Sequence, residues 1–388
     1  MKVLLAILML AAAAAAPTLA QQGPGTYVLQ PGQHSFETVM PEGNYRVTLT
    51  LGGGRTASDT TVKAEARRLM LEDVRTAPRH SVQRSFIVNV RRPELPPPPE
   101  NAPGGTAVRL KKDELGSPTW DDKLSLEFLG SAPDVRSVQI EPVTVPTVYL
   151  AGDSTVTDQV FEPTASWGQM LPRFFAPDIE IANYAESGET LKSFVTELRL
   201  AKILSLIKPG DWLLIQFGHN DEKKQWPQTY ADPRSTYPDY LRVFVDEARL
   251  HGATPILITP VERRDFDSSG KIVPSHGLYP DAVRAVAREK GTGLIDLTTL
   301  TTRFYEALGP TRAPLAFNDH GKDKTHQDNY GAYEMARMVA SSLVTADPRL
   351  AAHLLPEGRS FDPAHPDAPE TFPLPASSSY SNIRPQGS

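Results

Sequence analysis

From residue 21 to about residue 146, apolar and polar residues alternate along short runs that Gly, Pro, Asn and Asp separate. Alternation with a period of two is typical of strands with one buried face, and many short strands at this spacing favour an antiparallel β-sandwich. Four consecutive prolines between Glu94 and Gly105 predict a loop, because proline cannot donate to a sheet ladder. The runs lie at residues 44–53, 60–72, 85–95, 107–112, 123–130 and 135–143.

Beyond Pro146 the pattern changes to short apolar runs that alternate with segments of helical periodicity. Strands that are apolar on both faces, with helices between them, indicate a parallel sheet covered on both sides. The predicted fold class is therefore α/β, with three layers, preceded by the antiparallel β-sandwich. Strands are predicted at residues 147–152, 179–185, 211–218, 254–260 and 293–297, and helices at 166–175, 190–207, 237–252, 279–291 and 329–344.

The composition divides the chain into four parts. Residues 1–20 carry one lysine, an apolar run too short to span a bilayer comfortably, and small residues where a signal peptidase cuts. We therefore expect a cleaved secretory signal rather than a membrane anchor, and a bacterial periplasmic or extracellular protein. The sandwich domain then covers residues 21–145 and the α/β domain residues 146–346. Residues 347–388 form a Pro-rich tail without periodicity, either disordered or packed along the two domains.

Charge and cysteine content exclude several classes of function. The formal net charge is −6, which gives no electrostatic reason to expect nucleic acid as a partner. No cysteine is present, so thiol nucleophiles and cysteine-ligated zinc are excluded. After removal of the signal, no later segment could cross a membrane, so we expect no membrane partner.

Polar residues follow most of the predicted parallel strands at their carboxyl ends. The sequence VYLAGDSTV places Ser154 directly after the first strand, Gly188 lies in a turn after the second, and QFGHND ends the third. Ligands bind at this edge of a doubly wound sheet. The sequence therefore predicts a catalytic site there.

The residue types at this edge suit ester hydrolysis, which needs a nucleophile, a base, an orienting group and oxyanion donors. Ser154 is the candidate nucleophile, although a serine after a strand is also a common helix N-cap. His326 is the candidate base, and Asp323 can hold its tautomer from three residues away. Gly188 can offer an unobstructed backbone N–H and Asn220 a side-chain amide to the same oxyanion.

The blocks LAGDSTVTD, QFGHND and DKTHQDNYGAY, in this order with Gly188 between the first two, resemble the SGNH (GDSL-type) hydrolases. The match is most similar to the rhamnogalacturonan acetylesterase branch and covers about residues 147–345. The resemblance implies a flavodoxin-like fold, a triad of Ser154, Asp323 and His326, and an oxyanion hole from Ser154, Gly188 and Asn220. The β-sandwich resembles the galactose-binding-like domains that accompany polysaccharide enzymes.

One position departs from the branch. Its second block commonly reads Gly-Arg-Ser, whereas here Gly188 is followed by Glu189 and Thr190. The oxyanion donor Gly188 is kept, but this sequence has no arginine beside it that could contact an acidic substrate.

The resemblance implies a secreted carbohydrate esterase that removes acetyl groups from plant cell-wall polysaccharide, with pectic rhamnogalacturonan as the expected partner. The alternatives are an acetyl esterase acting on xylan or other oligosaccharides, a lipase-like SGNH hydrolase, and a catalytically inactive sugar-binding protein. His219, Arg263 and Arg264 are the expected substrate contacts, and the two arginines suit a uronate carboxylate. We expect no cofactor and no metal, although His320 with Asp323 and His326 is an alternative metal cluster.

Overall fold

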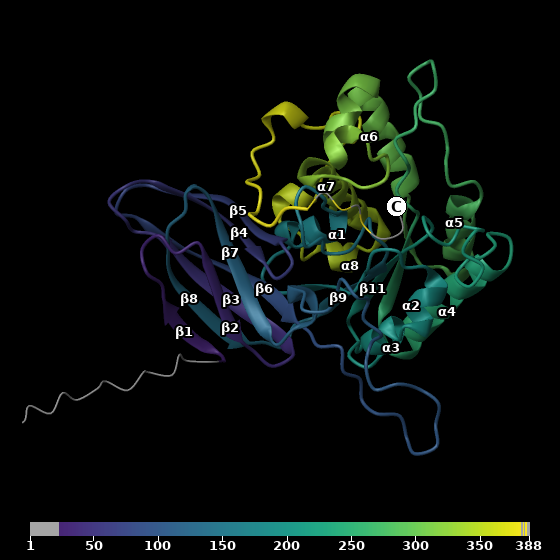
Figure 1. Ribbon diagram of the computed structural model, residues 1–388, viewed down its shortest axis with the longest axis horizontal. Helices are drawn as coiled ribbons and strands as arrows, with labels where there is room; N and C mark the ends of the chain where they lie inside the picture. Colours follow the sequence, from purple (N-terminus) through teal and green to yellow (C-terminus); the bar gives the residue numbers. More distant parts are fainter. Residues whose placement is uncertain (1–22, 382, 384, 386–388) are drawn as a thin grey trace, which may run out of the picture.

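The computed structural model describes residues 23–381, 383 and 385, so the signal peptide expected at residues 1–20 lies outside the described residues. The N-terminal part consists of two four-stranded antiparallel sheets packed face to face (Figure 1). Their orders are β1-β8-β3-β6 and β2-β7-β4-β5. The strands are β1 (Gly25–Val28), β2 (Ser35–Val39), β3 (Gly43–Gly52), β4 (Ser58–Ala64), β5 (Arg68–Thr76), β6 (Ser81–Val90), β7 (Lys123–Ala132) and β8 (Val135–Pro142).

The alternation in the sequence is what builds this sandwich. In β3, Val47, Leu49 and Leu51 point inward and are fully buried, while the residues between them lie partly exposed. They pack against Phe128 of β7 and Val138 of β8 in a single core between the sheets. The predicted antiparallel β-sandwich is confirmed.

Two of the predicted strands are wrong in detail. The run at residues 60–72 is two strands, because the chain turns at Glu65 and Arg67, which have positive φ angles of 54° and 64°. The run at residues 107–112 is not a strand. Val108 is buried there against the helices of the α/β part, so the alternation of apolar and polar residues in this run reflects burial of an irregular segment. The short strands β1 and β2 were not among the predicted runs.

The second part is a five-stranded parallel sheet with the strand order β10-β9-β11-β12-β13. This order is that of the flavodoxin-like fold, which confirms the predicted fold class. The strands are β9 (Thr147–Gly152), β10 (Glu180–Asn183), β11 (Trp212–Gln216), β12 (Thr254–Ile258) and β13 (Gly293–Ile295).

Successive residues of these strands point into two separate cores. Val148 and Leu150 of β9 face the helices α1, α6, α7 and α8, whereas Tyr149 and Ala151 face α2 to α5. Both faces are therefore covered, which is why the strands are apolar throughout. The helices are α1 (Trp167–Met170), α2 (Leu191–Thr196), α3 (Arg199–Leu204), α4 (Thr236–Leu250), α5 (Tyr279–Lys290), α6 (Leu297–Arg312), α7 (Asn329–Ala346) and α8 (Pro348–Ala351).

Two predicted helices are shorter than expected. The segment 166–175 forms α1 and a following 3₁₀ helix at Leu171–Phe174. The segment 190–207 is divided into α2 and α3, because Leu198 between them has a left-handed backbone with φ of 65°. None of the helices in the described part of the chain combines the length and the apolar character needed to cross a bilayer.

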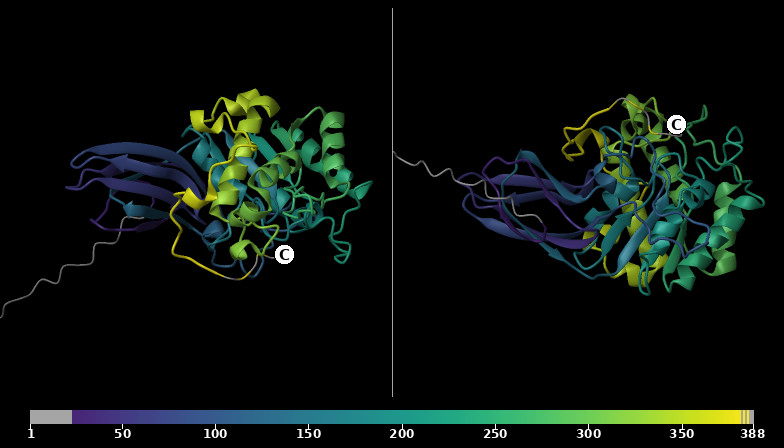
Figure 2. Two further views of the ribbon diagram at one scale, coloured as in Figure 1. Left: turned by 90° about the horizontal axis from the view of Figure 1, so that it is seen from above. Right: turned by 60° about the horizontal axis from the view of Figure 1, so that its bottom comes forward.

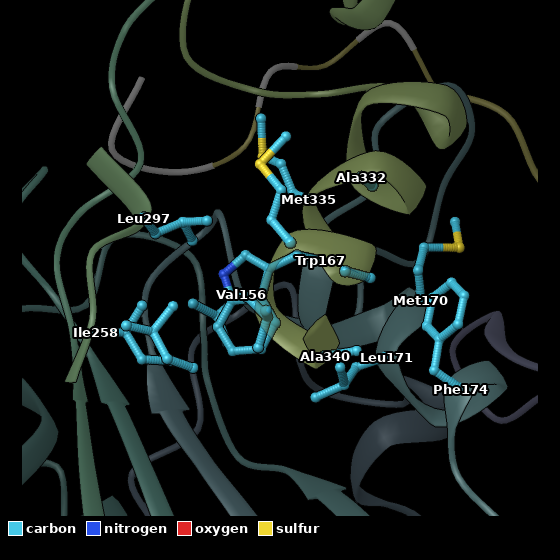
Figure 3. Packing of buried hydrophobic residues seen from close by; sticks show 14 of the residues in the cluster. Val156, Trp167, Met170, Leu171, Phe174, Ile258, Leu297, Ala332, Met335 and Ala340 are labelled. Carbon is cyan, nitrogen blue, oxygen red and sulfur yellow. The ribbon is translucent and has the colours of Figure 1, made fainter. Parts of the chain in front are cut away.

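The core on the α7 side centres on Trp167 of α1 (Figure 3). Its ring lies with Val156, Ile258, Leu297 and Met335, all of them almost fully buried. The indole N–H donates to Gln216 Oε1 over 2.8 Å, so the one polar atom of the ring has a partner inside the core. This places a rigid anchor directly beneath the loop that follows β9.

The sandwich and the α/β part are joined by a buried cluster of charges centred on Glu162. Its carboxylate lies 2.6 Å from the Arg67 guanidinium and 3.2 Å from Lys63 Nζ, both from the sandwich. Asn329 at the start of α7 donates to the same carboxylate over 2.9 Å. Burial alone would raise the pKa of Glu162, but Arg67 and Lys63 hold it below its usual range. One carboxylate therefore binds three segments of the fold.

The described part of the C-terminal tail is ordered against this cluster. Ser377 N donates to Glu162 Oε1 over 2.8 Å, and Lys63 Nζ donates to Ser377 Oγ over 3.0 Å. The backbone of Ser379 and Ser381 pairs with that of Glu162 at 2.8 and 2.9 Å. Figure 2 shows this C-terminal segment, in yellow, running over the junction of the two parts. Of the two expectations for the tail, its described residues fit packing along the domains.

Substituting Glu162 tests how strongly this cluster joins the two parts. Glu162→Gln keeps the size of the side chain but leaves Arg67 and Lys63 buried without a counter-charge, which costs roughly 3–5 kcal/mol. We expect chemical denaturation to show a loss of that size in the free energy of unfolding. Glu289→Gln, which breaks the exposed ion pair with Arg242, is the matched control and should change little. Equal stability of the two variants would contradict a role for the cluster.

Candidate active site

The carboxyl ends of β9, β10, β11 and β12 lie at one edge of the sheet, because the strands are parallel and adjacent. The loops that leave this edge carry Ser154, Gly188, Asn220 and Arg263. The loop before α7 joins them through a hydrogen bond of 2.9 Å from Ala165 N to Gln327 O. Residues that are far apart in the sequence are thus gathered in one place.

Ser154, His326 and Asp323 form one hydrogen-bonded chain. Ser154 Oγ lies 2.9 Å from His326 Nε2, and His326 Nδ1 lies 2.9 Å from Asp323 Oδ2. All three residues are buried. The second oxygen of Asp323 accepts the N–H groups of Thr325 and His326 at 2.8 and 3.0 Å, which fixes the carboxylate. This geometry lets the imidazole take the proton from the serine hydroxyl.

The charge of Asp323 is stabilised by its surroundings. Burial would raise its pKa, but the hydrogen bonds from the His326 ring and from the two backbone N–H groups lower it to about 2. The carboxylate is therefore ionised throughout the neutral range. It holds the proton of the imidazole on Nδ1 and leaves Nε2 to accept from Ser154.

The turn that presents Ser154 is held by a relay of side chains. Gln216, whose Oε1 accepts from the buried Trp167, donates from Nε2 to Thr155 Oγ1 over 2.6 Å. Thr155 in turn donates to Asp153 Oδ1 over 2.8 Å. Gly152, the last residue of β9, has to be glycine, because a Cβ at this position would lie 2.5 Å from a methyl group of Val156. The turn is thus fixed from the core side.

Three N–H groups are candidate oxyanion donors, namely the backbone N–H groups of Ser154 and Gly188 and the side-chain amide of Asn220. Gly188 has a φ of 79°, a left-handed conformation that suits glycine. Within the described residues, the backbone N–H groups of Ser154 and Gly188 donate to no other protein group. Asn220 uses one amide hydrogen on Glu189 O at 3.0 Å, and its Oδ1 accepts from Lys223 Nζ at 3.0 Å. The other amide hydrogen remains for a substrate oxygen.

Glu189, where the acetylesterase branch commonly has arginine, is fully buried beside this site. Its carboxylate lies 2.5 Å from Lys111 Nζ, accepts from Ser193 Oγ at 2.7 Å and lies 3.6 Å from Arg199 Nε. Lys111 also donates to Ser187 O over 2.5 Å. Lys111 and Glu189 therefore brace both sides of Gly188. Sequence reasoning missed Lys111, since it lies in a segment without any motif.

The three residues expected to contact substrate lie in different environments. His219 is buried, with Nδ1 3.4 Å from Asp153 Oδ2, and burial lowers its pKa to about 4, so the ring is neutral at pH 7. Arg264 is buried too, stacks on Phe317 and donates to Asp323 O over 3.2 Å. Its guanidinium thus supports the loop that carries Asp323 instead of facing a ligand.

Arg263 is the arginine that lies open to a recess. This recess has a volume of about 480 Å³, and its lining includes Lys223, Glu222 and His276. Arg263 forms an ion pair of 2.5 Å with Glu222 and keeps part of its side chain exposed. In the described part of the chain, no group of three or more histidine and acidic side chains is arranged to bind a metal. The side chain of His320 is not among those described, so the expectation of no metal stays a prediction.

A buried serine, histidine and aspartate are joined in one hydrogen-bonded series, and no described residue accepts from the N–H groups of Ser154 and Gly188. These features suit the chemistry of an acyl hydrolase. Residues 150–332 match the GDSL-like lipase/acylhydrolase family, and the chain belongs to this family. The resemblance to SGNH hydrolases drawn from the three sequence blocks is thereby confirmed.

Three proteins from Bacillus subtilis are similar to this chain. It is 40% identical over 221 residues to the rhamnogalacturonan acetylesterase RhgT, covering 94% of RhgT and 54% of this chain. It is 38% identical over 201 residues to YesY, described as a probable rhamnogalacturonan acetylesterase, covering 91% of YesY and 50% of this chain. The crystal structure of YxiM superposes with a TM-score of 0.51 at 26% identity, covering 82% of this chain and 81% of YxiM. This last likeness includes residues of the sandwich as well.

Asp323→Asn tests the orienting role of the carboxylate. An amide nitrogen at this position can donate to Nδ1 and hold the imidazole in the tautomer that cannot accept from Ser154. We expect kcat on p-nitrophenyl acetate to fall roughly 10³- to 10⁴-fold in a variant that circular dichroism shows to be folded. Asp246→Asn, an exposed isosteric change, should leave the rate as it is. Retention of a tenth of the activity would assign the orienting role to another residue.

Lys111→Met tests whether the brace around Gly188 matters for turnover. Without the ammonium group, Ser187 O and the Glu189 carboxylate lose their shared partner, and the Gly188 N–H is less well placed. We expect kcat on p-nitrophenyl acetate to fall about tenfold with KM nearly constant, since the loss of one full oxyanion donor costs about 10²- to 10³-fold. Lys111→Arg should recover part of the rate.

Lys112 is the natural control, because it is the adjacent lysine and is exposed. Lys112→Met should behave as the unmodified protein does. If Lys111→Met and Lys112→Met had the same kcat, Lys111 would have no part in positioning the donor.

Proposed function

We propose that this chain is a serine acetylesterase that removes acetyl groups from a plant cell-wall polysaccharide, with rhamnogalacturonan as its substrate. The observation that carries this proposal is the 40% identity to the rhamnogalacturonan acetylesterase RhgT over nearly the whole length of that enzyme. The hydrogen bonds that link Ser154, His326 and Asp323 support it, because a family member without these three linked residues could not hydrolyse an ester.

In the proposed first half-reaction, Ser154 Oγ attacks the acetyl carbonyl carbon while its proton passes to His326 Nε2. The carbonyl oxygen becomes an oxyanion and accepts from Ser154 N, Gly188 N and Asn220 Nδ2. The C–O bond to the sugar then breaks, and the imidazolium gives its proton to the departing sugar oxygen. The product is an acetyl ester on Ser154, and the free sugar hydroxyl leaves.

In the second half-reaction, water attacks the acetyl-serine and gives a proton to His326 Nε2. The same three donors stabilise the second oxyanion. When the bond to Ser154 Oγ breaks, the imidazolium returns its proton to the serine. Acetate is released and the side chains regain their starting protonation states, so the cycle needs no redox partner.

The charges around the site support a polymer that contains uronate. Lys223 and Arg263 line the recess of about 480 Å³ on the β11 and β12 side, where a carboxylate of the polymer can pair with them. These contacts are partly exposed, so each contributes modestly. Arg264, buried against Phe317, takes no part in this proposal.

Acetate release from polymers tests the proposed substrate. We expect the chain to hydrolyse p-nitrophenyl acetate and acetylated rhamnogalacturonan, to act weakly on long-chain p-nitrophenyl esters, and to prefer the pectic polymer over acetylated xylan. Ser154→Ala should lose roughly 10³- to 10⁶-fold in kcat on every substrate, which controls for contaminating esterases. Higher kcat/KM on acetylated xylan would overturn the pectic assignment, and higher kcat/KM on long-chain esters would overturn the acetylesterase assignment.

A further inference from the structure

A second recess lies close to the serine turn, and the segment between β6 and β7 forms part of its wall. Its volume is about 190 Å³, and four separate segments form its walls. They are the segment that leads from β6 to β7, the loop that follows Ser154, the turn before Gly188 and the C-terminal tail. None of the residues assigned to the reaction lines it, so this recess is distinct from the catalytic chain.

The recess nevertheless borders the reacting groups. Thr157, three residues beyond Ser154, and Ser187, directly before Gly188, both line it. Thr157 Oγ1 donates to Ala185 O over 2.8 Å, which ties the serine loop to the Gly188 turn along this wall. A polymer whose acetyl group lies at Ser154 therefore has a neighbouring unit within reach of the recess.

The walls carry hydroxyl and carboxyl groups, and no lysine or arginine is among the described lining residues. Two of the carboxylates already have partners, since Glu114 pairs with Arg199 at 2.5 Å and Asp158 with Arg68 at 3.3 Å. Among the described lining residues, these pairs leave no excess positive charge to attract an anion. A uronate carboxylate is thus disfavoured here, in contrast to the recess with Lys223 and Arg263.

Glu186 gives the recess a buried carboxyl group that can form further hydrogen bonds. One of its oxygens accepts from Ser187 N at 2.6 Å, and no described residue bonds to the other. Burial, together with the nearby charge of Glu114, raises the pKa of Glu186 to about 8. The side chain is therefore a neutral carboxylic acid at pH 7, which can both donate to and accept from a hydroxyl group.

An exposed aromatic ring stands at the rim. Phe161 also lines the recess and is 51% exposed, although most large apolar side chains of the chain are buried. Its backbone is held in place, because the next residue is Glu162, the centre of the buried charge cluster. The flat ring beside hydroxyl-bonding groups suits the C–H face of a sugar.

We propose that this recess binds a neutral sugar unit of the polymer that neighbours the acetylated one. Phe161 stacks on the sugar, and the hydroxyl and carboxyl groups of Thr157, Glu186 and Ser187 bind its hydroxyls. Ser381, Ile383 and Pro385 of the tail form the outer wall. The proposal rests on the proposed function and adds to it. A chain of alternating neutral and acidic sugars would place its uronate in one recess and its neutral sugar in the other.

Phe161→Ala is the test, measured with acetylated rhamnogalacturonan oligosaccharides and with p-nitrophenyl acetate. We expect KM for the oligosaccharide to rise about three- to tenfold, the size of one aromatic stacking contact, with kcat kept. Both constants for p-nitrophenyl acetate should stay unchanged, since this ester has no sugar. Phe161→Trp should restore the oligosaccharide KM. Leu250→Ala, at an apolar residue on α4 that is 78% exposed, is the control.

The selectivity for a neutral sugar is tested by binding. In calorimetry, the Ser154→Ala variant should bind deacetylated rhamnogalacturonan oligosaccharides. Adding Phe161→Ala to this variant should weaken its binding of these oligosaccharides more than its binding of oligogalacturonate. An unchanged oligosaccharide KM in Phe161→Ala, or an equal effect on oligogalacturonate, overturns the recess proposal. Failure of the proposed function is a different result, namely no acetate release from acetylated rhamnogalacturonan by the unmodified protein.

Discussion

Two adjacent arginines of the sandwich, Arg67 and Arg68, are buried where the two parts of the molecule meet, and their charges have to be balanced there. Arg67 is balanced by Glu162, and Arg68 lies 3.3 Å from Asp158 and 3.4 Å from Glu180. Asp158 and Glu162 both belong to the loop that follows Ser154. The sandwich therefore supplies the counter-charges that hold this loop in place.

The same dependence reaches the serine itself. Arg67 donates to Gln159 O over 3.1 Å, and the side chain of Gln159 donates to Ser154 O over 2.8 Å. On the opposite side, Lys111 from the segment between β6 and β7 braces the turn of Gly188. Residues that precede the α/β part thus hold both the candidate nucleophile and a candidate oxyanion donor in position. The α/β fold provides the edge of the sheet, and the N-terminal part fixes the loops upon it.

The sequence was sufficient for the parts of the fold that follow from periodicity. Strands with one or two buried faces, and the gathering of polar loops at one sheet edge, depend on local pattern and on general rules of parallel sheets. The catalytic candidates came from three compact motifs. Contacts between distant segments left no such signal. Lys111 lies 76 residues from Ser187, and the alternation around Val108 imitates a strand although it serves burial against helices. The sequence predicts Arg264 as a substrate contact because its partners in the structure, carbonyl groups and a phenyl ring, leave no trace in composition.

The buried cluster around Glu162 joins parts of the chain that are far apart in the sequence. Lys63 is 99 residues from Glu162 and 314 residues from Ser377. Closing loops of this length costs conformational entropy before the contacts form, and folds rich in such contacts fold slowly. A sandwich separated from the rest of the chain would also leave Arg67 and Lys63 without the Glu162 carboxylate. We therefore expect the sandwich to be less stable as an isolated fragment than within the whole molecule.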